Sequence, residues 1–275
     1  MPQLLSPKKI LCIHDLSGAG RCSLAVIVPV LSCLGHQPVC LPTAVLSTHT
    51  GGFGAPARME SEVYGAAALE HYARIGLEFD CIFSGYIASP AQARLIQQAF
   101  ALWPRAYKVV DPAMGDQGKL YGSLSPETVS AMGQLARAAD LILPNLTEAH
   151  LLLGLPQPAP EQCWTADAAA QLAETLRRIC PAVLITGLPA DGQLACAGTD
   201  GTPFVQLHTH LPRSYPGTGD LFAAVVTGLL LRGSTLANAA DRAARFVSAC
   251  ILATDPAADP RQGVWFEPLL GRLIL

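Results

Sequence analysis

Short apolar runs alternate with longer segments of helical periodicity along most of the chain. The runs "KKILCIHD" and "AVLITG" each contain a short apolar core, as expected of strands that are buried on both faces. The longer segments repeat apolar residues at spacings of three and four, and two of them open on the capping residues Ser89 and Thr165. This alternation predicts an α/β fold with three layers, in which a mostly parallel central sheet is flanked by helices.

The predicted elements follow one another in regular order. Strands are expected at residues 8–15, 37–47, 79–86, 106–112, 140–145 and 182–187, followed by a β-hairpin at residues 192–198 and 202–210. Helices are expected at residues 22–35, 59–76, 89–103, 125–139, 147–154, 165–180, 217–231 and 235–253. In open sheets of this kind ligands bind beyond the carboxyl ends of the strands, so we expect the functional residues there.

Composition supports one large globular domain that covers residues 1–275. The chain is 51% hydrophobic and 14% charged, and no repeat, low-complexity segment or linker divides it. The net charge of -3 excludes a basic surface for nucleic acid. The longest apolar run, Leu221–Leu231, is too short to span a bilayer, so we expect no membrane association.

The cysteines and the first residues indicate a cytoplasmic protein. The nine cysteines are odd in number, form no CxxC pair and lie mostly inside apolar runs, which is typical of buried free thiols in a reducing compartment. A reactive or zinc-binding cysteine is the alternative. The N-terminal sequence "MPQLLSPKKILCIHD" lacks the layout of a signal peptide because its basic pair follows the first apolar residues.

The stretch "PGTGDLFAA" places one carboxylate, Asp220, at the start of an apolar helix. The glycines Gly217 and Gly219 flank Thr218, so backbone N–H groups can converge there and bind an anion. An acid beside such a site can accept a proton from a substrate hydroxyl while the N–H groups stabilise a transferring phosphoryl group. The alternative is an ordinary acid in the first turn, but Thr218 is expected to supply the capping hydroxyl already. No P-loop motif occurs in the sequence.

A second group of polar residues follows the strands in the middle of the chain. In "LILPNLTEAHLLLG", Asn145 and Glu148 are three residues apart at a strand end that enters a helix, so both can face one point. Carboxylate and amide oxygens suit Mg²⁺. A capping box built on Thr147, or a plain loop, is the alternative. Asp111, before Pro112, ends another strand and is either a site residue or a turn acid.

Two further stretches have open interpretations. Thr186 ends the strand "AVLITG" and can reach a nucleotide or a bound cation, or it simply ends the strand. The Gly-rich segment "STHTGGFGAP", near residues 46–58, contains His49 and predicts a flap over the substrate. A plain flexible hairpin is the alternative for this segment.

Taken in order, these motifs resemble the ribokinase-like superfamily of ATP-dependent small-molecule kinases, and within it the pyridoxal/pyridoxamine kinases. The resemblance runs from about residue 8 to residue 255 and is carried by "STHTGG", "SGYIAS", "DPAMGDQGKLY", "PNLTEAHLL" and "GTGDLFAA". It implies a homodimer that transfers phosphate from ATP, with Mg²⁺ and a monovalent cation such as K⁺, to the 5'-hydroxymethyl group of pyridoxal, pyridoxamine or pyridoxine.

The resemblance also implies roles for individual residues. Asp220 would be the base, and the N–H groups of Gly217, Thr218 and Gly219 would hold the γ-phosphate. The residues implied for the metal are Asp111, Asn145 and Glu148; for the nucleotide, Asp116, Asn145, Thr186, Gly187 and Thr218; for the vitamer, Asp15, Thr43, His49, Tyr86 and Tyr121. Asp111 and Thr186 would hold the monovalent cation or phosphate oxygens.

The chain departs from the family pattern at Asp15, where the pyridoxal kinases carry a serine. The stretch "HDLSGAG" is more similar to the hydroxymethylpyrimidine kinases, whose first loop is also rich in Asp and Ser-Gly. If the Asp15 carboxylate faces the ring, it would favour vitamers that carry an amine; otherwise it caps the turn or the following helix. The alternative functions are a hydroxymethylpyrimidine kinase, a sugar or nucleoside kinase, and a non-catalytic vitamer-binding protein.

Overall fold

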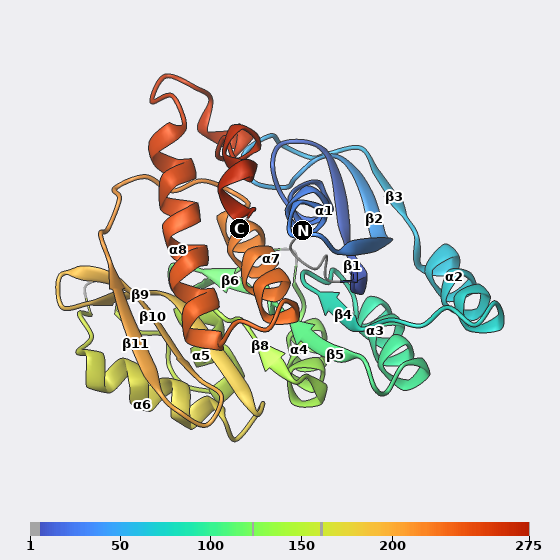
Figure 1. Ribbon diagram of the computed structural model, residues 1–275, viewed down its shortest axis with the longest axis horizontal. Coiled ribbons are helices and arrows are strands. Elements are labelled where there is room, and N and C mark those ends of the chain that lie inside the picture. Colours follow the sequence, from blue (N-terminus) through green and yellow to red (C-terminus); the bar gives the residue numbers. More distant parts are fainter. Residues whose placement is uncertain (1–5, 123, 160–161, 275) are drawn as a thin grey trace. The chain divides into compact units, whose positions relative to one another are not determined.

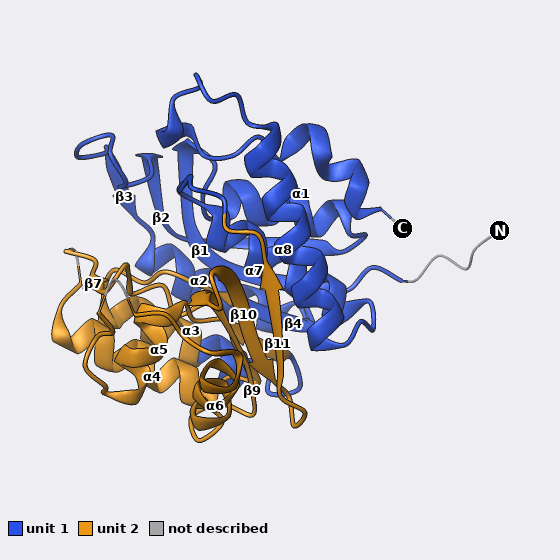
Figure 2. Cartoon of the chain, turned by 90° about the vertical axis from the view of Figure 1, so that its left-hand side faces the viewer, with its two compact units in different colours: residues 1–83, 98–106, 211–275 blue, residues 84–97, 107–210 orange. Residues whose placement is uncertain are grey.

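The structure, a computed structural model, describes residues 6–122, 124–159 and 162–274. The chain divides into two compact units (Figure 2). Unit 1 comprises residues 1–83, 98–106 and 211–275, and unit 2 comprises residues 84–97 and 107–210. The single domain expected from the sequence stays a prediction, and each unit is described by itself.

Unit 1 contains the first strands of the chain in the hydrogen-bonded order β4-β1-β2-β3 (Figure 1). Their bounds are Lys9–Ala19 for β1, Gln37–Thr48 for β2, Arg58–Glu60 for β3 and Cys81–Ser84 for β4, whose last residue belongs to unit 2. Strands β1 and β2 are parallel, whereas β3 joins β2 as an antiparallel edge. The side chains of Ile10 to Ile13 are fully buried, as expected of a central strand.

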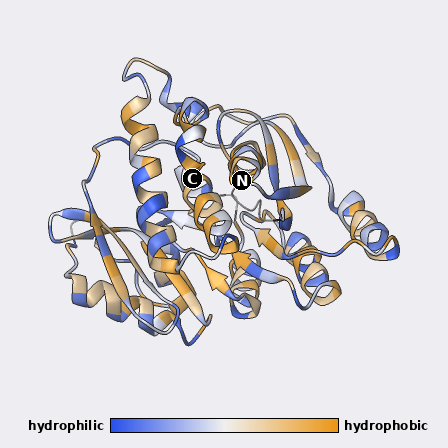
Figure 3. Cartoon of the chain, in the orientation of Figure 1, coloured by the Kyte–Doolittle hydropathy of each residue, from blue (hydrophilic) through white to orange (hydrophobic). Residues whose placement is uncertain are grey.

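Helices pack against these strands and against one another. They are α1 (Leu24–Cys33), α2 (Glu62–Arg74), α7 (Thr218–Leu231) and α8 (Leu236–Ala253), followed by the 3₁₀ helices η1 (Pro260–Gln262) and η2 (Glu267–Leu273). Helix α7 contacts α1 and α8, and it is buried without interruption from Leu221 to Leu229. Helix α8 buries only one face, and Figure 3 shows apolar and polar colours along it accordingly. Asp220 therefore stands at the start of a core helix.

Unit 2 contains the remaining strands, in the order β11-β10-β9-β8-β5. The strands are β5 (Tyr107–Val110), β8 (Leu141–Ile142), β9 (Ala182–Ala190), β10 (Gln193–Thr199) and β11 (Phe204–His208), with a separate small hairpin of β6 (Gly115–Asp116) and β7 (Lys119–Leu120). The helices are α4 (Pro126–Ala138), α5 (Leu146–Leu153) and α6 (Ala166–Leu176); α3 (Pro90–Leu102) begins in unit 2 and ends in unit 1. Strands β5, β8 and β9 are parallel, β10 and β11 form the predicted antiparallel hairpin, and β10 also pairs antiparallel with β9.

The structure confirms two predicted helix caps and lengthens two strands, whereas the helix expected from residue 59 begins only at Glu62 because residues 58–60 pair with β2 as β3. Thr165 accepts a hydrogen bond from the backbone N–H of Ala168 (3.2 Å), and Ser89 accepts one from Gln92 (3.3 Å). Strand β1 was expected to end near His14, but after a bulge between His14 and Leu16 it continues to pair with β2. Strand β9 continues past its predicted end because β10 supplies its hydrogen-bond partners.

Short elements in polar or Gly-rich segments were not predicted. They are β3, the β6–β7 hairpin and the two 3₁₀ helices. The strands among them are two or three residues long, and they form because a partner strand satisfies their backbone groups. Among the described residues, none of the helices combines the length and the apolar character that crossing a bilayer requires.

Candidate active site

The Gly-Thr-Gly-Asp segment forms the start of α7 in unit 1, as predicted. Gly217 precedes the helix with a φ of 78°, and a Cβ atom at this position would overlap the carbonyl oxygen of Arg21. Only glycine therefore fits both the backbone conformation and the space. The expected capping role of Thr218 is wrong: its hydroxyl donates to the carbonyl of Tyr215 (3.1 Å), and no side chain of the described residues caps this helix.

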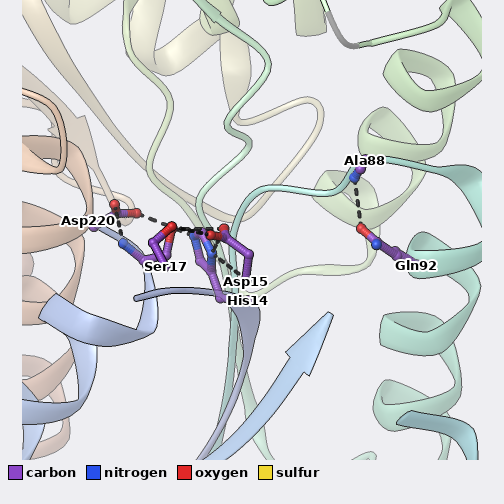
Figure 4. A network of polar contacts seen from close by, with 7 residues as sticks. His14, Asp15, Ser17, Ala88, Gln92 and Asp220 are labelled. Atoms are coloured by element: carbon purple, nitrogen blue, oxygen red, sulfur yellow. Dashed lines mark hydrogen bonds and ion pairs between the residues drawn. The ribbon is translucent and has the colours of Figure 1, made fainter. Parts of the chain in front are cut away.

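Asp220 is held from two sides by residues of the N-terminal segment (Figure 4). The backbone N–H of Ser23 donates to Oδ2 (2.7 Å), and Nε2 of His14 lies 3.3 Å from Oδ1. The side chain retains 16% of its exposure, so solvent or a ligand can still reach it. These two contacts fix the orientation of the carboxylate. Each oxygen keeps a second lone pair that can accept a proton.

His14, which was not among the predicted site residues, is buried at the bulge of β1 between two carboxylates. Its Nδ1 lies 2.9 Å from Oδ1 of Asp15, and its Nε2 faces Asp220. Burial by itself would lower the pKa of the imidazole, but hydrogen bonds and charge from Asp15 and Asp220 outweigh burial and raise the pKa to about 10. The ring is therefore an imidazolium at neutral pH. Its position beside Asp15 at a predicted strand end was the available signal.

Asp15 lies inside unit 1, where its carboxylate accepts several hydrogen bonds. Besides His14, Ser23 Oγ donates to its Oδ1 (2.8 Å) and Ser17 Oγ to its Oδ2 (3.1 Å). Burial would raise the pKa of this carboxyl, but the hydrogen bonds and charge of His14, with the two hydroxyls, lower it below its ordinary value. These contacts fit the role of holding the loop, and contact with a vitamer ring stays a prediction.

The predicted flap at residues 46–58 comprises the end of β2, a loop and the start of β3. In this loop His49 is buried and accepts at Nδ1 from the N–H of Gly51 (3.0 Å), so its Nε2 donates to the carbonyl of Arg261 (2.6 Å). The guanidinium of Arg261 lies over the ring of Phe53, 4.9 Å from its centroid. Both ring nitrogens of His49 thus bind protein groups, and its predicted contact with substrate is untested.

Asn145 and Glu148 form a capping box at the start of α5 in unit 2. Asn145 Oδ1 accepts from the N–H of Glu148 (2.9 Å), and Glu148 Oε2 accepts from the N–H of Asn145 (2.8 Å). The box is built on Asn145, so the alternative that placed it on Thr147 is wrong. The hydroxyl of Thr147 accepts instead from the N–H of Gly118 (2.9 Å), which is in the turn of the β6–β7 hairpin.

Glu148 is buried beside a second acid. Its Oε1 accepts from the N–H of Met114 (3.0 Å), and the amide of Asn145 donates to the carbonyl of Gly115 (2.7 Å). Burial, and then the nearby charge of Asp111, raise the pKa of Glu148 well above its ordinary value, although backbone N–H groups oppose this shift. Glu148 is buried and Asp111 is half-buried, and a divalent cation would remove the repulsion between their carboxylates. Within the described ranges, no group of three or more His, Cys, Asp or Glu side chains is arranged so that it could hold a metal ion.

The remaining predicted residues of unit 2 lie around this group. Thr186, on β9, forms a parallel bridge with Asn145, and its N–H donates to the carbonyl of Pro144 (2.9 Å). Gly187 follows with a φ of 69°. Asp116 is exposed on β6 and accepts from the N–H of Gln117 (2.8 Å). Asn145 thus links Thr186, through the bridge, with Glu148, through the capping box.

The residues predicted to contact the vitamer are placed in different environments. Thr43, in unit 1, is a buried residue of β2. Tyr86, in unit 2, follows β4 in the sequence, and its side chain is half-buried. Tyr121 is 41% exposed, and its N–H donates to the carbonyl of Met114 (2.9 Å). Gln92, also in unit 2, orders the loop after Tyr86 by accepting from the N–H of Ala88 (2.8 Å; Figure 4).

Comparison with known proteins identifies the family to which the chain belongs. Residues 29–263 match the family described as phosphomethylpyrimidine kinase. The chain is 31% identical to the pyridoxine/pyridoxal/pyridoxamine kinase of Bordetella bronchiseptica, over 88% of this chain and 89% of that protein. The chain therefore belongs to the phosphomethylpyrimidine kinase family, and within the ribokinase-like superfamily it groups with the pyridoxal kinases, as the resemblance in the sequence indicated.

Solved structures confirm the predicted fold class. Pyridoxal kinase from Lactobacillus plantarum superposes with a TM-score of 0.89 at 36% identity, covering 98% of this chain and 97% of that one. A Bacteroides thetaiotaomicron protein assigned as a phosphomethylpyrimidine kinase, solved in a crystal form with pyridoxal, gives a TM-score of 0.91 at 35% identity, covering 98% and 96%. The chain has the α/β fold of these kinases, a mostly parallel sheet flanked by helices.

Proposed function

We propose that the protein transfers the γ-phosphoryl group of ATP to the 5'-hydroxymethyl group of pyridoxal, pyridoxamine or pyridoxine and releases ADP. The observation that carries the proposal is Asp220, an accessible carboxylate fixed at the glycine-bounded start of α7. The relatives named for pyridoxal, pyridoxine and pyridoxamine, and the neighbour solved with pyridoxal, indicate the substrate class.

The start of α7 supplies two functions in this reaction. The Asp220 carboxylate accepts the proton of the substrate hydroxyl as its oxygen bonds to the γ-phosphorus, and the bond to the bridging oxygen of ADP breaks. The N–H groups of Gly217, Thr218 and Gly219, together with the helix dipole, stabilise the negative charge on the transferring group. Gly217, with its positive φ, is the residue from which the chain enters the first turn of α7, where the N–H groups of Thr218 and Gly219 lie.

A magnesium ion fits the acidic group of unit 2. Glu148, Asn145 and Asp111 would hold Mg²⁺, directly or through water, and the ion would neutralise phosphate charge. The raised pKa of Glu148 beside Asp111 supports this proposal, because a group that is costly to ionise alone is stabilised by a cation. Thr186, bridged to Asn145, would contribute with Asp111 to a monovalent cation such as K⁺ or to phosphate oxygens. A cytoplasmic homodimer is part of the same proposal.

A hydroxymethylpyrimidine kinase is the second candidate. The matching family model carries the name of that activity, and the "HDLSGAG" stretch is similar to the first loop of such enzymes. The same chemistry at Asp220 would serve both substrates, so only the acceptor distinguishes the candidates.

An ADP-release assay with separate acceptors tests the proposal. The wild type should turn over the three vitamers faster than hydroxymethylpyrimidine or ribose. Asp220→Asn should lower kcat by about 10²- to 10⁴-fold with little change in vitamer Kd, because the shape stays and the proton acceptor is lost. Asp241→Asn, the same change at a surface residue of α8, is the matched control. Faster turnover of hydroxymethylpyrimidine would favour the second candidate, and Asp220→Asn retaining more than about a third of kcat would exclude Asp220 as the base.

A further inference from the structure

A buried chain of hydrogen-bonding groups links Asp15, His14 and Asp220 in unit 1 (Figure 4). Asp15 and His14 are neighbours on β1, whereas Asp220 opens α7. Asp15 and His14 are almost fully buried, and Asp220 is the member that solvent reaches. The chain of contacts therefore runs from the interior of unit 1 to an accessible carboxylate.

We propose that His14 is a positioning residue for Asp220, and that Asp15 orients His14 for this task. The inference rests on the proposed function, in which Asp220 accepts the substrate proton. His14 does not touch the substrate in this proposal; it acts through the carboxylate that does.

The geometry explains why the carboxylate needs a second donor. The terminal torsion of an aspartate is broad and nearly two-fold, so one hydrogen bond leaves the plane of the carboxylate poorly defined. The N–H of Ser23 binds Oδ2 (2.7 Å) and His14 Nε2 faces Oδ1 (3.3 Å), so the two donors fix the plane from opposite oxygens. A base that is out of position by about 1 Å can lose on the order of 10²-fold in rate.

Asp15 determines which ring nitrogen faces Asp220. A proton on Nδ1 is bound by Oδ1 of Asp15 (2.9 Å), which directs Nε2–H toward Asp220. The backbone N–H of Asp15 also lies 3.0 Å from Nδ1 and would donate to it if the ring were neutral. In both states Nε2 carries a proton, so the donor toward Asp220 is kept.

The groups around the imidazole favour its charged state. The acids that face it are Asp15 on β1 and Asp220 on α7, and together they raise its pKa to about 10. The thiol of Cys22 lies near both acids, and burial followed by their charges raises its pKa far above the ordinary value, so it stays neutral. The positive charge of the imidazolium compensates the two carboxylates, so none of the three groups is left as an unpaired charge.

Two substitutions of His14 separate a positioning role from simple packing. The amide nitrogen of glutamine lies near the place of Nε2, so His14→Gln keeps a donor toward Asp220, whereas the amide of His14→Asn reaches only toward Asp15. We expect His14→Asn to lower kcat by about 10- to 100-fold with vitamer KM changed less than about 3-fold. His14→Gln should recover at least about 5-fold of that loss.

His36→Asn is the matched control, because His36 is another buried histidine of unit 1 and bonds only a backbone carbonyl, Gly228 O (2.8 Å), among the contacts seen. Its kcat should stay within about 2-fold of the wild type at a temperature where every variant is folded. Equal losses of kcat in the two His14 variants, or His14→Asn retaining more than about a third of kcat, would overturn the inference.

A titration by NMR tests the same contacts without any turnover. With labelled histidine, the His14 imidazole should titrate near pH 10 in the wild type, and Asp220→Asn should lower this pKa by about one unit or more, whereas Asp241→Asn should not. A His14 pKa that Asp220→Asn leaves unchanged would overturn the inference. If the coupling is present but no vitamer is phosphorylated, the proposed function fails and the contact between His14 and Asp220 stands.

Discussion

At the scale of single residues, the most unusual feature is the pairing of charges inside unit 1. His14 carries a positive charge between the carboxylates of Asp15 and Asp220, and the three groups share hydrogen bonds. Such a group is stable only when each member keeps its partners, because an unpaired buried charge costs several kcal/mol. The ionisation of these residues should therefore be visible in the pH dependence of stability.

The first prediction concerns this pH dependence. The pKa of His14 is raised from 6.5 to about 10, so its contribution to the free energy of unfolding is complete below pH 6.5 and is lost as pH rises to about 10. The pKa of Asp15 is lowered from 3.8, so its contribution is present above that pH and is lost on acidification. Urea unfolding of the wild type and His14→Gln should show a stability difference that shrinks between pH 6.5 and 10. A constant difference would contradict a charged His14.

Glu148 leads to a second prediction at this scale. Because burial and Asp111 raise its pKa in the folded state, Glu148 destabilises the metal-free fold at pH values above its ordinary pKa. Glu148→Gln removes the charge and keeps an oxygen that can accept from the N–H of Asn145. We expect the variant to need several-fold more Mg²⁺ for half-maximal activity, because a hard cation prefers an ionised oxygen ligand to a neutral amide. An unchanged Mg²⁺ requirement would leave Glu148 with the capping role alone.

At the scale of elements, the start of α7 depends on where its backbone passes. Gly217 lies against the carbonyl of Arg21, whereas nothing lies within 4 Å of the place of a Cβ at Gly219. Two glycines of one motif, two positions apart, thus have different physical reasons to be present. Gly217 is required by the fold, and the reason for Gly219 has to come from the ligand side of the helix.

The third prediction compares these two glycines. Gly217→Ala should destabilise the protein by about 2 kcal/mol or more, because the added methyl group meets Arg21 and the positive φ becomes strained. Gly219→Ala should be neutral or stabilising, since alanine is favoured in a helix by about 1 kcal/mol. Thermal melting of both variants checks this. Similar melting temperatures would show that the chain at Gly217 can move away from Arg21.

At the scale of the whole molecule, the burial of the cysteines shows how far solvent is excluded from the interior. All nine cysteines lie in the described part of the chain, and no disulfide joins any two of them. Six are buried, Cys33 is half-buried, and Cys40 and Cys163 are exposed. Burial raises the pKa of several of them, to about 12 for Cys180 and Cys250, which suppresses the reactive thiolate.

The fourth prediction follows from this distribution. A thiol-specific reagent such as DTNB should modify Cys40 and Cys163 rapidly in the native protein and all nine cysteines after unfolding. The double variant Cys40→Ser and Cys163→Ser should lose the fast phase and keep its melting temperature. A fast phase that persists in this variant would show that a buried cysteine opens to solvent.

Features that depend on neighbouring residues could be predicted from the sequence, whereas features that depend on distant residues could not. The caps at Ser89 and Thr165 and the long apolar helix after Asp220 are set by neighbouring residues, so the sequence predicted them. His14 was missed because its role comes from Asp220, near the other end of the chain. Strand β3 and the β6–β7 hairpin were missed for the same reason, since their partners rather than their composition define them. The roles of Thr43, Tyr86 and Tyr121 stay predictions.

The division of the chain also has a consequence for how the protein is made. Unit 1 is assembled from the first and last stretches of the sequence, and 197 positions separate Ser23 from Asp220, which it holds. At a synthesis rate of about 5–20 residues per second, Ser23 leaves the ribosome roughly 10–40 s before Asp220. Throughout that interval helix α1 lacks α7, against which it packs in the complete protein. Asp15 and His14 are likewise present before Asp220, the third member of their charged group. A chain released early therefore lacks both Asp220 and the rest of the core helix α7, so an incomplete product lacks the proposed base of the phosphoryl transfer.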